Sequence, residues 1–267
     1  MPKIDKSNLS KEEWHKIRDA RRLEKEKNKL RKEREKRKKI QDNKKENPPK
    51  PTPRSITQPY EGEKVREINY KANTAFVIGN GTSRQSINLE ELYKFGNIYA
   101  CNAIYREFDP DYLVAVDVKM INEINRAKYQ YKNPNVWTNP NKSFNGMRNL
   151  NYFRPSKGWS SGPTALWLAS QHNYRDIYIL GFDYKGLENG KRLNNIYADT
   201  ENYKKSHESA TFFGNWLRQT TSVVRDNSKK NYYRVIHPDN YIPDELNNYE
   251  NIKHIFIEDF KKMFNLS

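Results

Sequence analysis

This chain of 267 residues is predicted to be an α/β protein, with a Rossmann-like, mainly parallel sheet covered by helices on both faces and a basic helical tail before it. Three observations lead to that prediction. Short, nearly continuous apolar runs alternate with helical patterns, as in parallel sheets whose strands are buried on both sides. Charge is concentrated near the N-terminus, where residues 1–50 carry 20 Lys or Arg against 10 Asp or Glu. No repeat of about 20 to 50 residues is visible, which argues against solenoids and propellers.

The first segment in chain order is the basic tail, to which we assign residues 1–47. Residues 11–45 are rich in strong helix formers and contain neither Gly nor Pro. Apolar residues are too sparse there for a core-facing stripe, so we expect the helix to project into solvent. Prolines crowd the next segment, which we interpret as an extended tether over 48–73 that leads to a domain spanning 74–267.

Within this domain, the apolar runs predict strands at 74–79, 97–101, 112–117, 136–139, 177–183 and 232–237. The segments between them predict helices at 88–95, 119–129, 162–172 and 207–224. Because parallel strands need crossover connections, the carboxyl ends of the strands meet at one edge of the sheet. Open α/β sheets bind ligands at that edge.

Composition excludes several classes of protein. A single cysteine excludes an intrachain disulfide framework and a multi-cysteine zinc site, and it fits a reducing compartment. No apolar run approaches the roughly 20 residues that span a bilayer, and the N-terminus lacks a secretory signal pattern. We therefore expect a cytoplasmic protein, or a peripheral one at the inner face of the membrane. The net charge of +16 favours nucleic acid, an anionic membrane surface or a protein assembly as the partner of the tail.

The loop after the first predicted strand contains Gly79, Asn80, Gly81 and Ser83, small residues that let backbone amides approach a ligand. A phosphate- or nucleotide-binding loop has this pattern, but a tight turn is the commoner explanation for it alone. The spacing differs from a dinucleotide fingerprint, and the Lys-Ser/Thr pair of a P-loop is missing. NAD and ATP therefore have little support as ligands.

Further polar residues follow at the same predicted edge. Asn102 comes directly after the second strand, and its amide could hydrogen-bond a base or a ribose, although alone it is more simply a turn residue. Ser161 and Gly162 open a predicted helix, whose N-terminus favours anions. Asp183 closes the strand that this helix feeds, so helix start and strand end converge on one edge.

Taken together, these segments resemble the family 42 glycosyltransferases, the bacterial CMP-sialic acid-dependent sialyltransferases. The nucleotide site of that family has a Gly-Asn-Gly-x-Ser loop, a Cys-Asn pair, a Ser-Gly helix start and a Gly-x-Asp-Phe/Tyr strand end. All four patterns occur here in that order, and the resemblance covers residues 74–224. It implies a Rossmann-like fold, a CMP-sugar as donor substrate, and no required metal or other cofactor.

The resemblance also implies roles for the matching residues. The nucleotide part of the donor would be bound by Gly79, Asn80, Gly81, Ser83, Asn102, Ser161, Gly162 and Asp183. Tyr197 would bind the departing phosphate. Lys185 stands where the family has a second tyrosine, for which the adjacent Tyr184 could substitute, and a lysine could also neutralise the phosphate. This departure leaves the donor sugar open.

His207 stands where the family places its catalytic base, at the start of the helix predicted over 207–224. A neutral imidazole with a pKa of about 6.5 can take a proton from an acceptor hydroxyl. An exposed histidine at a helix start is the alternative, and the resemblance makes the two interpretations equal. We interpret His172, His237 and His254 as structural.

Metal binding has weaker support. Asp109 and Asp111 form an Asp-x-Asp pattern, which many metal-dependent glycosyltransferases contain, but they precede a strand, so a proline-containing turn is the better explanation. Asp117 supplies only one carboxylate at the next strand end. We expect no required metal. Trp159, beside the Ser-Gly turn, could stack on a sugar or a base, although aromatic residues are more often part of a core.

We therefore expect a glycosyltransferase in which a hydroxyl of a glycan or other acceptor attacks the donor sugar directly. His207 would remove the proton, and Tyr197 with Lys185 or Tyr184 would stabilise the leaving phosphate. The alternative is a non-catalytic binding or structural protein, with a Rossmann-like scaffold and a tail that docks on nucleic acid or an assembly. A nucleotide-dependent phosphotransferase is a weaker alternative, because the Walker-type lysine is missing.

Overall fold

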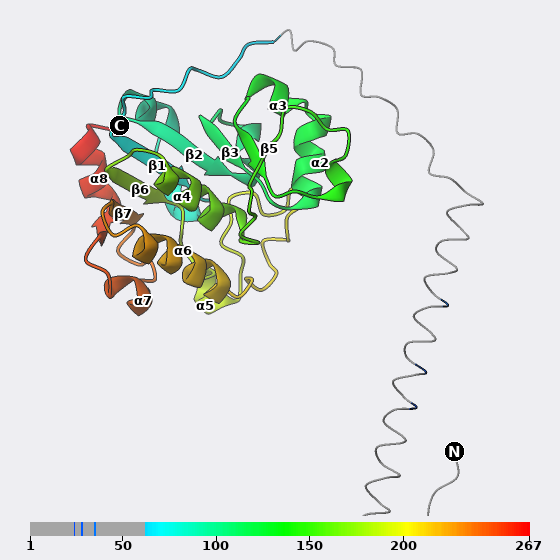
Figure 1. Ribbon diagram of the computed structural model, residues 1–267. Helices are drawn as coiled ribbons and strands as arrows, with labels where there is room; N and C mark the ends of the chain where they lie inside the picture. The colour runs from blue at the N-terminus through cyan, green and yellow to red at the C-terminus, as the bar shows by residue number, and fades with distance from the viewer. Residues whose placement is uncertain (1–23, 25–27, 29–34, 36–61) are drawn as a thin grey trace, which may run out of the picture. The chain divides into compact units, whose positions relative to one another are not determined.

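The computed structural model describes Glu24, Asn28, Glu35 and residues 62–267 (Figure 1). The three separate residues are helical. The rest of the tail predicted over 1–47 and most of the tether predicted over 48–73 lie outside the described residues, so those two assignments stay predictions. No helix in the described part of the chain combines the length and the apolar character needed to cross a membrane.

The domain is built on an eight-stranded sheet in which neighbouring strands are parallel, in the order β5-β4-β3-β2-β1-β6-β7-β8 (Figure 1). The strands are β1 Thr74–Ile78, β2 Asn97–Cys101, β3 Tyr112–Val114, β4 Val136–Thr138, β5 Asn151–Tyr152, β6 Asp176–Leu180, β7 Asn231–Ile236 and β8 Ile252–Phe256. This arrangement confirms the predicted Rossmann-like α/β fold. The two outermost strands, β5 and β8, were not predicted. They lie at the sheet edges, where their partial burial leaves no continuous apolar run.

Helices connect successive strands. The α-helices are α2 Val118–Arg126, α3 Tyr129–Lys132, α4 Ser161–Gln171, α5 Leu187–Gly190, α6 Gly214–Asp226, α7 Asp244–Asn247 and α8 Ile257–Phe264. The 3₁₀ helices are η1 Thr82–Arg84, η2 Leu89–Lys94, η3 Asn102–Arg106 and η4 Lys142–Phe144. The helices predicted at 119–129 and 162–172 are confirmed to within a few residues, whereas the segment 88–95 contains a 3₁₀ helix and no α-helix.

One predicted helix start is wrong. The helix expected over 207–224 begins at Gly214, so His207 does not open it. The preceding backbone is bonded elsewhere, because Glu208 N donates to Lys205 O and Ala210 N donates to Gly190 O in α5. These bonds hold the segment before α6 in turns and irregular backbone.

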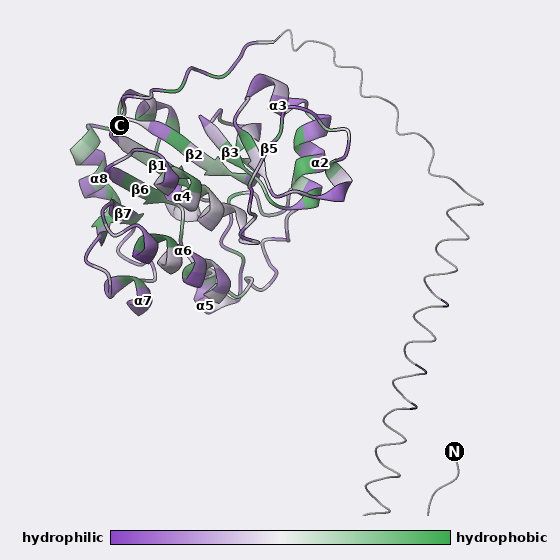
Figure 2. Ribbon diagram, viewed as in Figure 1, coloured by the Kyte–Doolittle hydropathy of each residue, from purple (hydrophilic) through white to green (hydrophobic). Residues whose placement is uncertain are grey.

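Apolar side chains cover both faces of the sheet. On one face the core includes side chains of α4, α6 and α7, with Leu166 and Leu217 among them. On the other face it includes side chains of α2, α3 and α8, such as Ile121 and Phe260. Figure 2 shows hydrophobic residues along the central strands and on part of α2. Burial on both faces explains why the central strands are continuously apolar.

The packed domain reaches upstream of Thr74, where the sequence prediction placed its start. Arg66 donates from Nε and Nη2 to the two oxygens of Asp111 at 2.8 and 2.7 Å, and also donates to Tyr93 O and Gly96 O. The carboxylate of Asp111 is fully buried and also accepts a hydrogen bond from Ile98 N at 2.7 Å. The guanidinium group of Arg66 therefore neutralises the buried charge of Asp111 at the amino end of the sheet.

Substitution of Arg66 by Ala is expected to destabilise the protein strongly. The buried Asp111 carboxylate loses its charged partner, which costs about 3 kcal/mol or more. Arg225→Ala is the control, because its ion pair with Asp226 is more than half exposed on both sides and is worth about 0 to 1 kcal/mol. Urea unfolding of both variants measures the difference, and equal stabilities would show that Asp111 does not depend on Arg66.

His254 on β8 lies opposite Arg234 on the neighbouring strand β7. Neither ring nitrogen of His254 has a hydrogen-bond partner, and the Arg234 side chain is almost fully buried. Burial, together with the smaller effect of the Arg234 charge, lowers the pKa of His254 to about 4. His254 is therefore neutral in the folded protein near neutral pH.

Acid is expected to destabilise the wild type more than a His254→Gln variant. As the pH falls from about 6.5 towards 4, the unfolded chain binds a proton at His254 that the folded protein does not bind, so stability falls. Carboxylate protonation affects both proteins alike. Urea unfolding at pH values of about 7 and 4.5 tests this, and the same loss in both proteins would contradict the lowered pKa.

Candidate functional site

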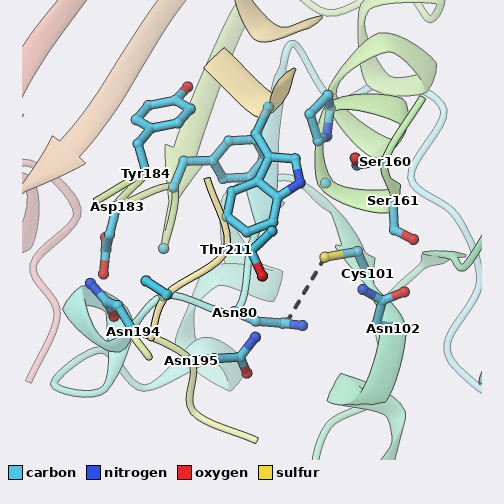
Figure 3. A pocket seen from close by; sticks show the side chains of 18 of the residues that line it. Asn80, Cys101, Asn102, Ser160, Ser161, Asp183, Tyr184, Asn194, Asn195 and Thr211 are labelled. Atoms are coloured by element: carbon cyan, nitrogen blue, oxygen red, sulfur yellow. Dashed lines mark hydrogen bonds between the residues drawn. The ribbon is translucent and has the colours of Figure 1, made fainter. Parts of the chain in front are cut away.

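A cavity of about 730 Å³ lies at the carboxyl edge of the sheet (Figure 3). Its wall is formed by the residues that follow β1, β2, β3, β4 and β6, together with the first turn of α4. From β1 the strand order runs to β5 in one direction and from β6 to β8 in the other, so the chain reverses direction beside β1. Such a reversal opens a crevice between loops that leave the sheet on opposite faces, where ligands bind in α/β proteins.

Glycines let the ends of β1 and β6 come close together beneath this cavity. Gly79 N donates to Leu180 O at 2.8 Å, and Gly81 N donates to Gly181 O at 2.9 Å. A Cβ atom on Gly79 would lie 2.5 Å from Gly181 O, and one on Gly81 would lie 2.5 Å from the Asp183 carboxylate. The Gly-Asn-Gly loop is therefore at least a close-packed turn, and Gly79, Asn80 and Gly81 also line the cavity.

Asp183 lines the cavity, but its carboxylate is bound within the protein. One oxygen accepts a hydrogen bond from Ser83 N at 3.0 Å, and the other accepts one from the Ser83 hydroxyl. Ser83 is buried and is not among the cavity-lining residues. Asp183 and Ser83, both expected to bind the ligand, thus join the β1 and β6 loops to each other.

The part of the cavity wall that follows β2 and β4 contains two side-chain amide oxygens without hydrogen-bond partners. Asn102 has a left-handed backbone, with φ of 58°, and its Oδ1 atom is buried without a hydrogen-bond partner. The Oδ1 atom of Asn139 is buried and unpaired in the same way. Asn80 differs, because its Nδ2 donates to the Tyr203 hydroxyl at 3.2 Å and its Oδ1 accepts from Cys101 Sγ at 3.9 Å (Figure 3). A ligand that carries N–H or O–H donors would satisfy the free oxygens.

The first turn of α4 forms another part of the wall. Ser161 Oγ accepts a hydrogen bond from Val116 N at 3.1 Å, so the start of α4 is fixed to the end of β3. The first N–H groups of a helix have no partner within it, and they favour anions. Gly162 lies close to the Phe182 ring, and Trp159 forms part of the wall while it also packs against the core.

The residues expected to stabilise the leaving group are separated. Lys185 lines the cavity, and its Nζ donates to Asn189 Oδ1 at 3.3 Å. Tyr184 also borders the cavity, but its hydroxyl is buried and Arg234 lies 5.0 Å from its ring, on the β7 side. Burial raises the pKa of Tyr184. Of the two residues, Lys185 is the better placed to meet a phosphate.

Tyr197 and His207 are not among the residues that line the cavity. The Tyr197 hydroxyl is buried, where it donates to Glu107 Oε1 at 2.6 Å and accepts from Arg84 Nη2 at 2.9 Å. His207 is exposed in a turn before α6. The structure therefore does not bring these two expected catalytic residues to the cavity.

Several wall residues were missed as ligand-binding candidates. Asn139 follows β4 directly, so the rule that located Asn102 could have identified it, whereas Asp117, three residues after the end of β3, was considered only as a metal ligand. Asn194 accepts hydrogen bonds from Thr82 N at 2.9 Å and from Thr82 Oγ1 at 2.8 Å, and it joins the wall from a loop with no recognisable pattern. Thr211, in the segment before α6, and Trp216, in the first turn of α6, also line the cavity.

The Asp-x-Asp pattern lies away from this edge. Asp111 is bound to Arg66, and Asp109 forms an ion pair with Lys132, both before β3 begins. In the described part of the chain, no group of three or more His, Cys, Asp or Glu side chains is placed to hold a metal ion. These two aspartates therefore have structural partners.

Comparisons with protein-family models, with curated proteins and with solved structures found no match to this chain.

Replacement of Gly79 by Ala is expected to destabilise the protein by about 1 to 3 kcal/mol, because the new methyl group meets Gly181 O on the adjacent loop. Gly162→Ala is the matched control, since its Cβ would lie 3.4 Å from the nearest atom of Phe182, an ordinary contact. Urea unfolding measures both. A Gly79→Ala variant as stable as Gly162→Ala would show that the loop after β1 can shift.

Proposed function

We propose that the protein is a glycosyltransferase that binds a nucleotide-activated sugar, with CMP as the nucleotide, in the cavity at the carboxyl edge of the sheet. The observation that carries this proposal is the convergence of four separate segments on one cavity: Gly79–Gly81, Asn102, Ser161–Gly162 and Asp183–Lys185. These are the segments that resemble the nucleotide site of the family 42 glycosyltransferases. A volume of about 730 Å³ is within the range of small-molecule sites.

The polar groups on the wall suit the parts of a CMP-sugar. The unpaired oxygens of Asn102 and Asn139 can accept hydrogen bonds from the amino group of cytosine or from sugar hydroxyls. The start of α4 and the ammonium group of Lys185 supply positive potential for the phosphate. The indole of Trp159 offers a flat face for a ring.

In the proposed reaction, a hydroxyl oxygen of the acceptor attacks the anomeric carbon of the donor sugar. The bond from that carbon to the phosphate oxygen breaks, and CMP leaves with the electron pair. Lys185 and the α4 N-terminus stabilise the charge that develops on the phosphate. His207 and Tyr197 have no part in this scheme, because neither lines the cavity.

A second candidate function is nucleotide binding without sugar transfer. The positions of Tyr197 and His207 favour it, because the two residues that the family resemblance assigns to catalysis lie outside the cavity wall. In either case the tail, with 20 Lys or Arg in residues 1–50, would hold the protein near a polyanion such as nucleic acid or an anionic membrane surface. Consumption of a CMP-sugar separates the two functions.

Removal of the Asn102 amide is expected to weaken CMP binding by about 1 to 3 kcal/mol, or roughly 5- to 150-fold in Kd. Asn102→Gly is the suitable variant, because glycine accepts the left-handed backbone at φ of 58°. Asn149→Gly is the matched control, since Asn149 has φ of 59° and is exposed. Calorimetric titration with CMP, UDP, GDP and ATP measures affinity and selectivity. No saturable binding of CMP would rule out the proposed donor.

A further inference from the structure

Asp117 is an acidic residue on the cavity wall whose side chain has no structural role in the fold. It lies between β3 and α2, and its backbone oxygen accepts the first hydrogen bond of α2, from Ile121 N at 3.0 Å. An aspartate at this position normally caps the helix with its side chain. Here the side chain makes no capping bond, and in residues 62–267 it has no hydrogen bond or ion pair. Asp117 is exposed and lines the cavity, so its carboxylate is open to a ligand there and has no partner within residues 62–267.

Asp183, the other carboxylate on the cavity wall, has hydrogen-bond partners within the protein. Both oxygens of Asp183 accept hydrogen bonds from Ser83, so that carboxylate holds two loops together. Asp117 is consequently the wall carboxylate with oxygens available to a ligand. An ionised carboxylate can accept several hydrogen bonds and can also accept a proton.

The surroundings of Asp117 place it next to the groups assigned to the donor. Val116 N donates to Ser161 Oγ at 3.1 Å, which fixes the backbone beside Asp117 to the start of α4. Cys101 pairs with Val114 between the parallel strands β2 and β3, so the segment that carries Asp117 leaves the sheet beside the end of β2. Asp117 thus shares the cavity wall with the α4 start and with the Cys101-Asn102 pair.

We propose that Asp117 is the general base of the transfer reaction, in the role that the sequence assigned to His207. This proposal rests on the proposed glycosyltransferase function. The Asp117 carboxylate takes the proton of the acceptor hydroxyl while the acceptor oxygen forms its bond to the anomeric carbon. The bond from that carbon to the phosphate breaks at the same time, and CMP leaves with the electron pair. When no acceptor is present, water takes the place of the hydroxyl.

Other titratable groups near the cavity are less suited to this step. The Cys101 thiol is buried and stays protonated near neutral pH. The Tyr184 hydroxyl is buried on the side of Arg234. Lys185 is cationic and already donates to Asn189. His207 is exposed and does not line the cavity.

The test compares the full chain with three single variants. Asp117→Asn keeps the size and hydrogen-bonding capacity of the side chain but removes its basicity. Asp259→Asn makes the same chemical change at an exposed position on α8 and serves as the control. His207→Asn tests the rival base. For each protein, calorimetry measures the Kd for CMP, and chromatography measures hydrolysis of CMP-N-acetylneuraminic acid, UDP-glucose and GDP-mannose.

Asp117→Asn is expected to bind CMP with at least wild-type affinity, because it removes a negative charge near the phosphate site. Its donor turnover is expected to fall by a factor of roughly 10² to 10⁴. The other two variants should keep turnover to within about threefold, too small a change for the loss of a base. The assignment is overturned if Asp117→Asn retains turnover, if it loses CMP binding, or if His207→Asn shows the large loss.

The two proposals fail in distinguishable ways. If the wild type hydrolyses a donor and Asp117→Asn hydrolyses it at the same rate, only the assignment of Asp117 as the base is wrong. If the wild type binds CMP but hydrolyses none of the three donors, the proposed glycosyltransferase function is wrong, and so is the assignment of Asp117 as the base. In that case the binding function without catalysis is correct.

Discussion

The site depends on the parallel pairing of β1 with β6. This pairing runs from Thr74↔Asp176 to Ile78↔Leu180 and continues past the strands through the bonds of Gly79 and Gly81 to the β6 loop. Because glycine has no Cβ, these two loops approach each other as closely as strands do. The floor of the cavity is therefore backbone from two distant parts of the chain.

The close contact between the β1 and β6 loops determines which polar side chains near the cavity are bonded within the protein. Asp183 is drawn into the contact and bonds to Ser83, and Arg84 donates to Gly79 O at 2.9 Å from the buried side. The side chains that follow β2, β3 and β4 are not needed for this contact. Asn102, Asp117 and Asn139 follow β2, β3 and β4 in turn, and their oxygens lack hydrogen-bond partners within the described domain.

A polar group without a partner is costly when it is buried, so an array of such groups favours a ligand that pairs with them. The wall combines neutral amides with one cationic side chain, Lys185, and one uncommitted carboxylate, Asp117. A ligand with an uncharged ring at one end and a phosphate at the other matches this distribution. The proposed nucleotide-activated sugar is a ligand of this kind.

The sequence alone determined the α/β class, the central strands, the helix at α4 and the edge at which polar residues gather, because these depend on short-range patterns of apolar residues and turns. Gly79, Asn102 and Asp183 were found through the rule that parallel strands end together. Only the tertiary structure decided that Asp183 bonds to Ser83, that Tyr197 bonds to Arg84 and Glu107, and that His207 lies outside the cavity. Each of those outcomes depends on contacts between residues far apart in the chain, for which local periodicity carries no signal.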